Sequence, residues 1–89
     1  MSQQKNKVVM YTTRFCPYCL RAKSLLEQKG VEFEEIDVDF DRSRRMEMIE
    51  KSSQTSVPQI WIGEKHVGGC DELFMLERQG NLDSLLWNL

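Results

Sequence analysis

Short runs of apolar residues of the kind that form β-strands recur along this chain, and one of them, residues 32–38, alternates between polar and apolar positions. The clearest runs are residues 7–11, 32–38 and 59–62. Successive side chains of a strand point to opposite faces of a sheet, and β-branched and aromatic residues favour strands. A tight turn over residues 63–65 follows the third run, and His66 and Val67 begin a returning run. The pattern therefore predicts four strands, of which the last two form a hairpin.

Segments with the period of an α-helix separate these strands. They are residues 17–29, 41–52 and 70–79, followed by a short last helix marked by Leu82, Leu85, Leu86 and Leu89. Pro17 suits the first turn of a helix, and Gly30 and Gly80 follow the first and third segments as helix ends. Asp41 is expected to cap the second segment. The residues expected on its inward face are Met46, Met48 and Ile49.

The order of these elements is β-α-β-α-β-β-α with a short C-terminal helix. A strand, a helix and a strand in succession give two parallel strands with a right-handed crossover, whereas a hairpin returns antiparallel. The sequence therefore predicts an α/β fold with one four-stranded mixed sheet flanked by helices. A chain of 89 residues buries one modest core, so residues 1–89 are expected to form a single domain. Residues 1–6 are expected to be a frayed tail.

Charge and composition narrow the classes of partner. The net charge is −2, which predicts neither nucleic acid nor a membrane as a partner. No apolar run approaches membrane-spanning length, residues 1–7 are polar and the three cysteines do not have the spacing of a disulfide scaffold, so a reducing, cytoplasmic location is expected. The protein is also expected to be a monomer. The charge is uneven, because residues 1–26 carry five Lys and Arg and no Asp or Glu. This local positive field favours a thiolate and an anionic thiol substrate.

The motif Cys16-Pro17-Tyr18-Cys19 carries the chemistry of the chain. It lies where the first strand gives way to the first helix, and a helix N-terminus stabilises a thiolate through its N–H groups and dipole. Two intervening residues keep both sulfurs within disulfide reach. We therefore expect Cys16 to be the exposed, more acidic nucleophile and Cys19, one turn into the helix, to be the buried resolving thiol. The cations nearest in sequence are Arg14, Arg21 and Lys23.

Three segments together resemble the dithiol glutaredoxins. They are Tyr11-Thr12 with Cys16-Pro17-Tyr18-Cys19, then Ser56-Val57-Pro58-Gln59-Ile60, then Gly68-Gly69-Cys70-Asp71. They stand in the family's order and spacing, over residues 8–86, and the small bacterial glutaredoxin 3 type looks most similar. The resemblance implies a thioredoxin fold and a glutathione-dependent thiol–disulfide oxidoreductase. Glutathione is then the co-substrate, and no metal is expected.

The resemblance also implies which residues bind glutathione. They are Arg14, Tyr18, Val57, Pro58, Cys70 and Asp71, with Gln54 or Lys51 as a further polar contact. In the family the Val57–Pro58 bond is cis, and the backbone at Val57 pairs with the cysteine of glutathione. Asp71 and the first N–H groups of its helix would hold the γ-glutamyl carboxylate, which agrees with the anion preference of helix N-termini. Arg14 would bind the glycyl carboxylate, in place of a lysine that the family often has one residue earlier.

The implied reaction has two routes. In the first, the Cys16 thiolate attacks a protein–glutathione mixed disulfide at the glutathione sulfur, and a second glutathione regenerates Cys16. In the second, Cys16 forms a mixed disulfide with a protein, and Cys19 resolves it. The implied partners are glutathione and proteins with disulfides or glutathione adducts, ribonucleotide reductase among them.

Other interpretations remain open from the sequence. Some similar proteins hold an iron–sulfur cluster between two subunits with this cysteine and glutathione, although Pro17 stiffens the turn and favours catalysis. A thioredoxin reduced directly by a reductase is weaker, because the motif lacks that family's Trp and Gly-Pro. Structural zinc is weaker still, since His66 is the one histidine and no second pair of ligands accompanies the motif.

Several single residues are expected to pack and not to react. Cys70 is either a small packed residue or a third reactive thiol, and packing is favoured. Tyr11 and Phe15 are expected in the core or the pocket wall. Trp61 and Trp87 are expected to pack, because no basic face accompanies them.

Overall fold

A computed structural model describes residues 3–88 of the chain. The elements are β1 (Val8–Thr12), α1 (Pro17–Gln28), β2 (Phe33–Asp37), α2 (Arg42–Ser52), β3 (Gln59–Ile62), β4 (Lys65–Gly68), α3 (Cys70–Arg78) and α4 (Leu82–Leu86). This order confirms the predicted one, and the bounds agree with the expected ranges to within a residue or two at most ends. Within the described residues, no helix has both the length and the apolarity needed to span a bilayer.

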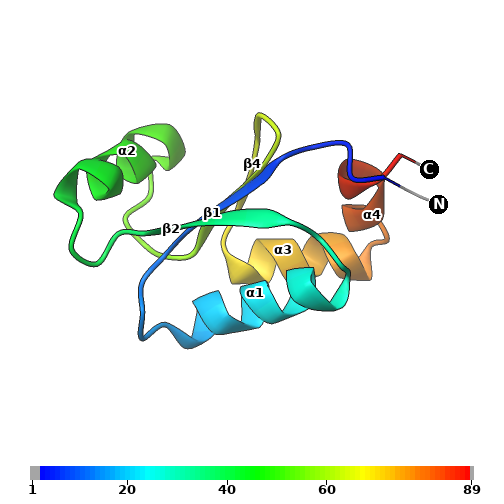
Figure 1. Cartoon of the computed structure of the whole chain (residues 1–89), viewed down its shortest axis with the longest axis horizontal. Coiled ribbons are helices and arrows are strands. Elements are labelled where there is room, and N and C mark those ends of the chain that lie inside the picture. The colour runs from blue at the N-terminus through cyan, green and yellow to red at the C-terminus, as the bar shows by residue number, and fades with distance from the viewer. Residues whose placement is uncertain (1–2, 89) are drawn as a thin grey trace.

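The four strands form one sheet in the order β2-β1-β3-β4 (Figure 1). β1 pairs with β2 in parallel and with β3 antiparallel, and β4 returns antiparallel to β3. The sheet is therefore mixed, as predicted. With helices on both of its faces, it has the architecture of the thioredoxin fold.

Two apolar clusters lie on the two faces of this sheet. The larger one joins β1 and β3 to α1, α3 and α4; its fully buried members include Met10, Leu26, Ile60, Leu73 and Leu86. The smaller one lies under α2 and contains Tyr11, Ile36, Val38, Met48 and Trp61. Consecutive residues of one strand, such as Met10 and Tyr11, serve opposite clusters because strand side chains alternate between faces. Figure 1 shows α1 and α3 side by side on one side of the strands and α2 apart from them.

The inward face of α2 differs from the predicted one. Met48 is fully buried and Ile49 packs partly against the smaller cluster, as expected, but Met46 is 50% exposed. Each helical residue turns the side chain by about 100°, so Met46 lies on nearly the opposite side of α2 from Met48. The prediction for Met46 is wrong for this reason. Asp41 caps α2 as predicted, since its Oδ1 accepts from the Arg44 N–H at 3.0 Å.

The segment before β1 is held in place, so the predicted frayed tail is wrong for residues 3–6. The Gln4 side chain accepts from the Glu32 N–H and donates to the Glu32 carbonyl, both at 2.8 Å. Asn6 donates to the Leu85 carbonyl at 2.8 Å. These contacts join the segment to Glu32, the residue before β2, and to α4. The first two residues of the predicted tail, and Leu89 of the predicted last helix, lie outside the described residues.

Lys29 ties the end of α1 to the C-terminal helices. Its Nζ lies 2.7 Å from the Glu77 carboxylate in α3 and 2.9 Å from Asp83 in α4. These ion pairs raise the pKa of Lys29 against the opposing effect of its burial. The pairs therefore hold the C-terminal end of α1, the end opposite to Cys16, against α3 and α4.

Candidate active site

Cys16 is the N-cap residue of α1, and its sulfur has two hydrogen-bond partners. The Cys19 N–H donates to Cys16 Sγ at 3.3 Å, and the Cys16 S–H donates to the carbonyl of Val57 at 3.7 Å. No acidic residue lies in the first turn of α1. The sulfur is therefore at the positive end of a helix with an N–H aimed at it, which is an environment that favours negative charge.

The two cysteines of the motif differ in burial. Cys16 is 8% exposed and Cys19 is 1% exposed. Cys16 is the more accessible of the two, as predicted, but the prediction of an exposed sulfur is wrong. The sulfur is directed toward the Val57 carbonyl, so the loop before β3 covers much of it.

The pKa of Cys19 is raised to about 12. Burial is the largest cause, because a thiolate loses its hydration there, and the hydrogen bond with Cys16 is the second. The backbone at Thr13 and the charge of Lys23 act in the opposite direction. Cys19 is thus a protonated thiol at neutral pH.

The loop between α2 and β3 brings Val57 and Pro58 next to the motif. The bond between them is cis, as the resemblance implied. Pro58 immediately precedes β3, where its missing N–H leaves no gap in the sheet.

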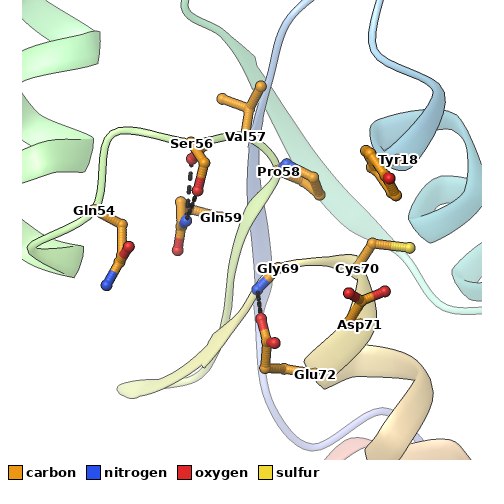
Figure 2. Close-up of a pocket in the computed structure, with 10 residues that line it drawn as sticks. All are labelled: Tyr18, Gln54, Ser56, Val57, Pro58, Gln59, Gly69, Cys70, Asp71 and Glu72. Atoms are coloured by element: carbon orange, nitrogen blue, oxygen red, sulfur yellow. Dashed lines mark hydrogen bonds between the residues drawn. The ribbon is translucent and has the colours of Figure 1, made fainter.

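A pocket of about 480 Å³ opens beside this loop (Figure 2). Its lining residues are Tyr18, Gln54, Ser56, Val57, Pro58, Gln59, Gly69, Cys70, Asp71 and Glu72. They come from three places in the chain: the start of α1, the loop and first residue of β3, and the start of α3. The structure therefore brings together five of the six residues that the resemblance implied for glutathione, and Gln54 as well.

Arg14 is the sixth, and it does not line the pocket. Its Nε lies 3.6 Å from Asp37 Oδ2, and its guanidinium lies over the ring of Phe40 at 4.9 Å. The backbone N–H of Arg14 donates to the Asp39 carboxylate at 2.7 Å. These contacts direct the side chain toward the end of β2. The described geometry gives no support to Arg14 as the partner of the glycyl carboxylate.

The start of α3 forms one wall of the pocket. Gly69 is the N-cap, and Glu72 Oε1 accepts from the Gly69 N–H at 2.7 Å. The first helical hydrogen bond runs from the Leu73 N–H to the Gly69 carbonyl at 3.1 Å, so the N–H groups of Cys70 and Asp71 precede the bonded part of the helix. Such N–H groups bind anions.

Comparison with known proteins identifies the family. The family model described as glutaredoxin matches residues 8–67. A glutaredoxin of Pseudomonas aeruginosa is 61% identical over 79 residues, which are 89% of this chain and 94% of the relative. This chain belongs to the glutaredoxin family.

Two further relatives agree. Glutaredoxin 3 of Escherichia coli K12 is 52% identical over 79 residues, which are 89% of this chain and 95% of the relative. The crystal structure of a buckwheat glutaredoxin–glutathione complex has a TM-score of 0.84 and 32% identity, over 91% of this chain and 76% of that one. Glutaredoxins are thiol–disulfide oxidoreductases that use glutathione, and this activity extends to the present member.

Cys70, the third cysteine of this glutaredoxin, is buried among the core residues of the larger cluster. Burial raises the pKa of Cys70, and the neighbouring Asp71 and Glu72 raise it further, against the charge of Arg21. These effects keep Cys70 protonated and agree with the packing role. In residues 3–88, no three His, Cys, Asp or Glu side chains gather as metal ligands.

The aromatic residues near the motif are placed differently from one another. Tyr11 is buried in the smaller cluster, as predicted, and its hydroxyl donates to Glu47 at 2.6 Å. Phe15 is 94% exposed, so the prediction that it lies in the core or the pocket wall is wrong. It occupies the turn between β1 and α1, where its side chain points away from both clusters. Trp61 packs edge-on against Tyr11, as predicted.

Four lining residues were not predicted for the site: Ser56, Gln59, Gly69 and Glu72. The signal for Gln59 was present, because it is the one polar residue in the run Gln59-Ile60-Trp61-Ile62 and all four positions are buried. A polar residue in a buried strand needs hydrogen-bond partners, and those partners are often functional. The glutamate three residues after a glycine N-cap was a similar signal for Glu72.

Proposed function

We propose that this glutaredoxin reduces protein–glutathione mixed disulfides and protein disulfides, with Cys16 as the nucleophile and Cys19 as the resolving thiol. The observation that carries the proposal is the contrast between the two sulfurs. Cys16 Sγ accepts an N–H at the start of α1, whereas burial raises the pKa of Cys19 to about 12. The thiolate is the attacking species in thiol–disulfide exchange, so Cys16 attacks first.

The first route uses Cys16 alone. Its thiolate attacks the glutathione sulfur of a mixed disulfide, a bond between Cys16 and glutathione forms, and the protein sulfur leaves as a thiolate that takes a proton from water. A second glutathione, as its thiolate, then attacks the bound glutathione sulfur. Oxidised glutathione leaves, and Cys16 returns as a thiolate.

The pocket supplies the contacts for the glutathione half of the substrate. Tyr18, Val57, Pro58, Cys70 and Asp71 are among the residues that line it. In the resting state the Val57 carbonyl accepts from the Cys16 S–H. Loss of that proton frees the carbonyl to accept from the N–H of the glutathione cysteine, so activation of the nucleophile also prepares the binding backbone.

The second route needs Cys19. After Cys16 has formed a disulfide with a substrate protein, Cys19 attacks Cys16 Sγ, the substrate sulfur leaves reduced, and Cys16 and Cys19 become a disulfide. Two effects that raise the pKa of Cys19, its hydrogen bond with Cys16 and the charge of Cys16, are absent once Cys16 is in a disulfide. Cys19 therefore becomes more acidic at the stage at which it must react. Two glutathione molecules then restore both thiols.

We also propose that the protein acts as a monomer in a reducing compartment, which we take to be the cytoplasm. One chain supplies both cysteines and every wall of the pocket. The reaction consumes reduced glutathione, which such a compartment maintains. Sedimentation of the purified protein as a dimer at micromolar concentration would contradict the monomer.

The deciding experiment measures turnover of a cysteine–glutathione mixed disulfide, coupled to glutathione reductase and NADPH. Wild type and Cys16→Ser are compared at equal concentration. Rapid turnover by wild type and none by Cys16→Ser supports the proposal. Equal rates would remove Cys16 as the nucleophile, and absence of wild-type turnover would reject the function.

A further inference from the structure

Gln59 holds the loop that carries Val57. It is the first residue of β3 and is 3% exposed. Its Nε2 donates to the carbonyl of Ser56 at 3.0 Å and lies 3.3 Å from the Ser56 hydroxyl (Figure 2). The buried amide group of Gln59 therefore donates its hydrogen bonds to Ser56, the residue just before Val57.

The Ser56 carbonyl and the Val57 N–H belong to one peptide unit. Val57–Pro58 is the cis bond of this loop, and the Ser56–Val57 bond is trans. A trans peptide is planar, and its C=O and N–H point in opposite directions. The hydrogen bond that fixes the Ser56 carbonyl therefore also fixes the direction of the Val57 N–H.

The Val57 N–H is available to a ligand. It forms no hydrogen bond with another residue in the described part of the chain, 3–88. Its residue lines the pocket, and the adjacent Val57 carbonyl faces Cys16. An unpartnered backbone donor next to an apolar wall is a strong recognition element for a peptide-like ligand.

His66 orients the amide of Gln59 from the other side. Its Nε2 lies 2.7 Å from Gln59 Oε1, and its ring packs on Trp61 with centroids 4.6 Å apart. Because Gln59 Nε2 faces a carbonyl, which only accepts, Oε1 must face His66, and His66 Nε2 must carry the proton. The contacts therefore form a chain from His66 in β4 through Gln59 in β3 to Ser56.

We propose that Gln59, oriented by His66, is a positioning residue for glutathione. It holds the Ser56–Val57 peptide so that the Val57 N–H meets the backbone carbonyl of the glutathione cysteine. The inference rests on the proposed function, because it concerns the binding of the same substrate. Gln59 acts through the loop and touches none of the reacting sulfurs.

The test substitutes Gln59→Met, which keeps the length and removes both polar atoms. The KM for a cysteine–glutathione mixed disulfide is expected to rise about tenfold with kcat changed less than about twofold, the pattern of lost binding. Alkylation of Cys16 by iodoacetamide, which does not use the pocket, is expected to stay within about twofold. An unchanged KM in folded Gln59→Met overturns the inference.

A second variant, His66→Phe, keeps an aromatic ring on Trp61 and removes the donor to Gln59. It is expected to raise KM about threefold, the loss of one weak hydrogen bond. Because His66 acts through Gln59, the double variant is expected to match Gln59→Met alone. If the KM of the double variant rose by the product of the two single-variant factors, the two residues would act independently, which would contradict the chain of contacts. If Gln59→Met does not fold, an unchanged KM in His66→Phe overturns the inference.

The control is Lys29→Met, which removes the ion pairs with Glu77 and Asp83 on the far side of the fold. It is expected to lower the melting temperature and leave KM unchanged, so a KM effect in Gln59→Met is not a general result of lost stability. A KM rise of similar size in Lys29→Met would contradict the specific role. Wild-type protein without turnover rejects the proposed function, whereas wild-type turnover with unchanged KM in the Gln59 variant rejects this inference alone.

Discussion

The thiol of Cys16 donates to the carbonyl oxygen of Val57 across 3.7 Å, although 41 positions separate the two residues in the chain. One hydrogen bond thus joins the nucleophile at the start of α1 to the loop before β3. That loop also borders the pocket in which the glutathione half of the substrate is proposed to lie. Reactivity at the sulfur and binding at the backbone are therefore linked at a single contact.

Cys19→Ser should separate the two routes. The hydroxyl keeps the size of the side chain but cannot form a disulfide, so the variant is expected to turn over glutathione mixed disulfides at a rate within about threefold of wild type. Reduction of an intramolecular protein disulfide should fall by about a hundredfold or more. Insulin reduction and the mixed-disulfide assay measure the two activities. Survival of both at wild-type rates would show that Cys19 is not the resolving thiol.

Asp71→Ala should weaken glutathione binding more than it affects the nucleophile. Asp71 lines the pocket at the start of α3 and is not a hydrogen-bond partner of the Cys16 sulfur. We expect the KM for glutathione to rise about tenfold, while the rate of Cys16 alkylation by iodoacetamide changes less than about twofold. Asp83→Ala, in the first turn of α4, is the matched control. A rise of the KM accompanied by an equally large fall in the alkylation rate of Cys16 in Asp71→Ala would indicate a general disturbance of the site.

Arg14→Ala tests whether this cation binds glutathione. The side chain pairs with Asp37 at a site where both residues are largely exposed, so its loss should change the free energy of unfolding by less than about 1 kcal/mol. We expect the KM for glutathione to stay within about twofold, because Arg14 does not line the pocket. A rise of tenfold or more would mean that the side chain leaves Asp37 and enters the pocket when glutathione binds.

Gly68→Ala should disturb the start of α3. Gly68 has φ +115°, and a Cβ there would lie 2.8 Å from Glu72 Oε1, the atom that accepts from the Gly69 N–H. Strain and a lost cap are expected to lower the free energy of unfolding by about 2–3 kcal/mol and to raise the KM for glutathione. Gly30→Ala is the control, since Gly30 has φ +72° with open space around it. Its cost should be about 1 kcal/mol, with KM unchanged.

Alkaline pH should destabilise the reduced protein. The pKa of Cys19 rises from 9.0 to about 12 and that of Tyr11 from 10.0 to about 12. Between the ordinary pKa and the raised pKa of each group, the folded state holds a proton that the unfolded state has lost. The free energy of unfolding from these groups is therefore full below pH 9 and falls as pH rises toward 12. Each group contributes at most about 1.4 kcal/mol per pH unit. Urea unfolding in the presence of a reductant measures the slope.

Two variants show which side chains cause the fall in the free energy of unfolding at alkaline pH. Cys19→Ala should reduce the part that begins near pH 9, to which Cys70 also contributes because its pKa is raised, and Tyr11→Phe should reduce the part that begins near pH 10. A slope unchanged in both variants would show that neither group is responsible.

The order of elements, the mixed sheet and the identity of the motif could all be predicted from the amino-acid sequence. These follow from local causes: side-chain periodicity, Pro17 in a first helical turn, Pro58 before a strand and glycines at helix ends. The resemblance added the cis bond and most of the pocket, because its three segments meet at one edge of the fold.

Which side chains face the site could not be predicted from the sequence, because it depends on how the elements pack. Arg14 is adjacent to the motif in sequence, yet Asp37 and Phe40 hold it away from the pocket. Phe15 is adjacent as well and is exposed, while Gln59, distant in sequence, is buried against the loop. Periodicity specifies the face of an element, whereas the partner of a charged or polar side chain depends on which elements pack together.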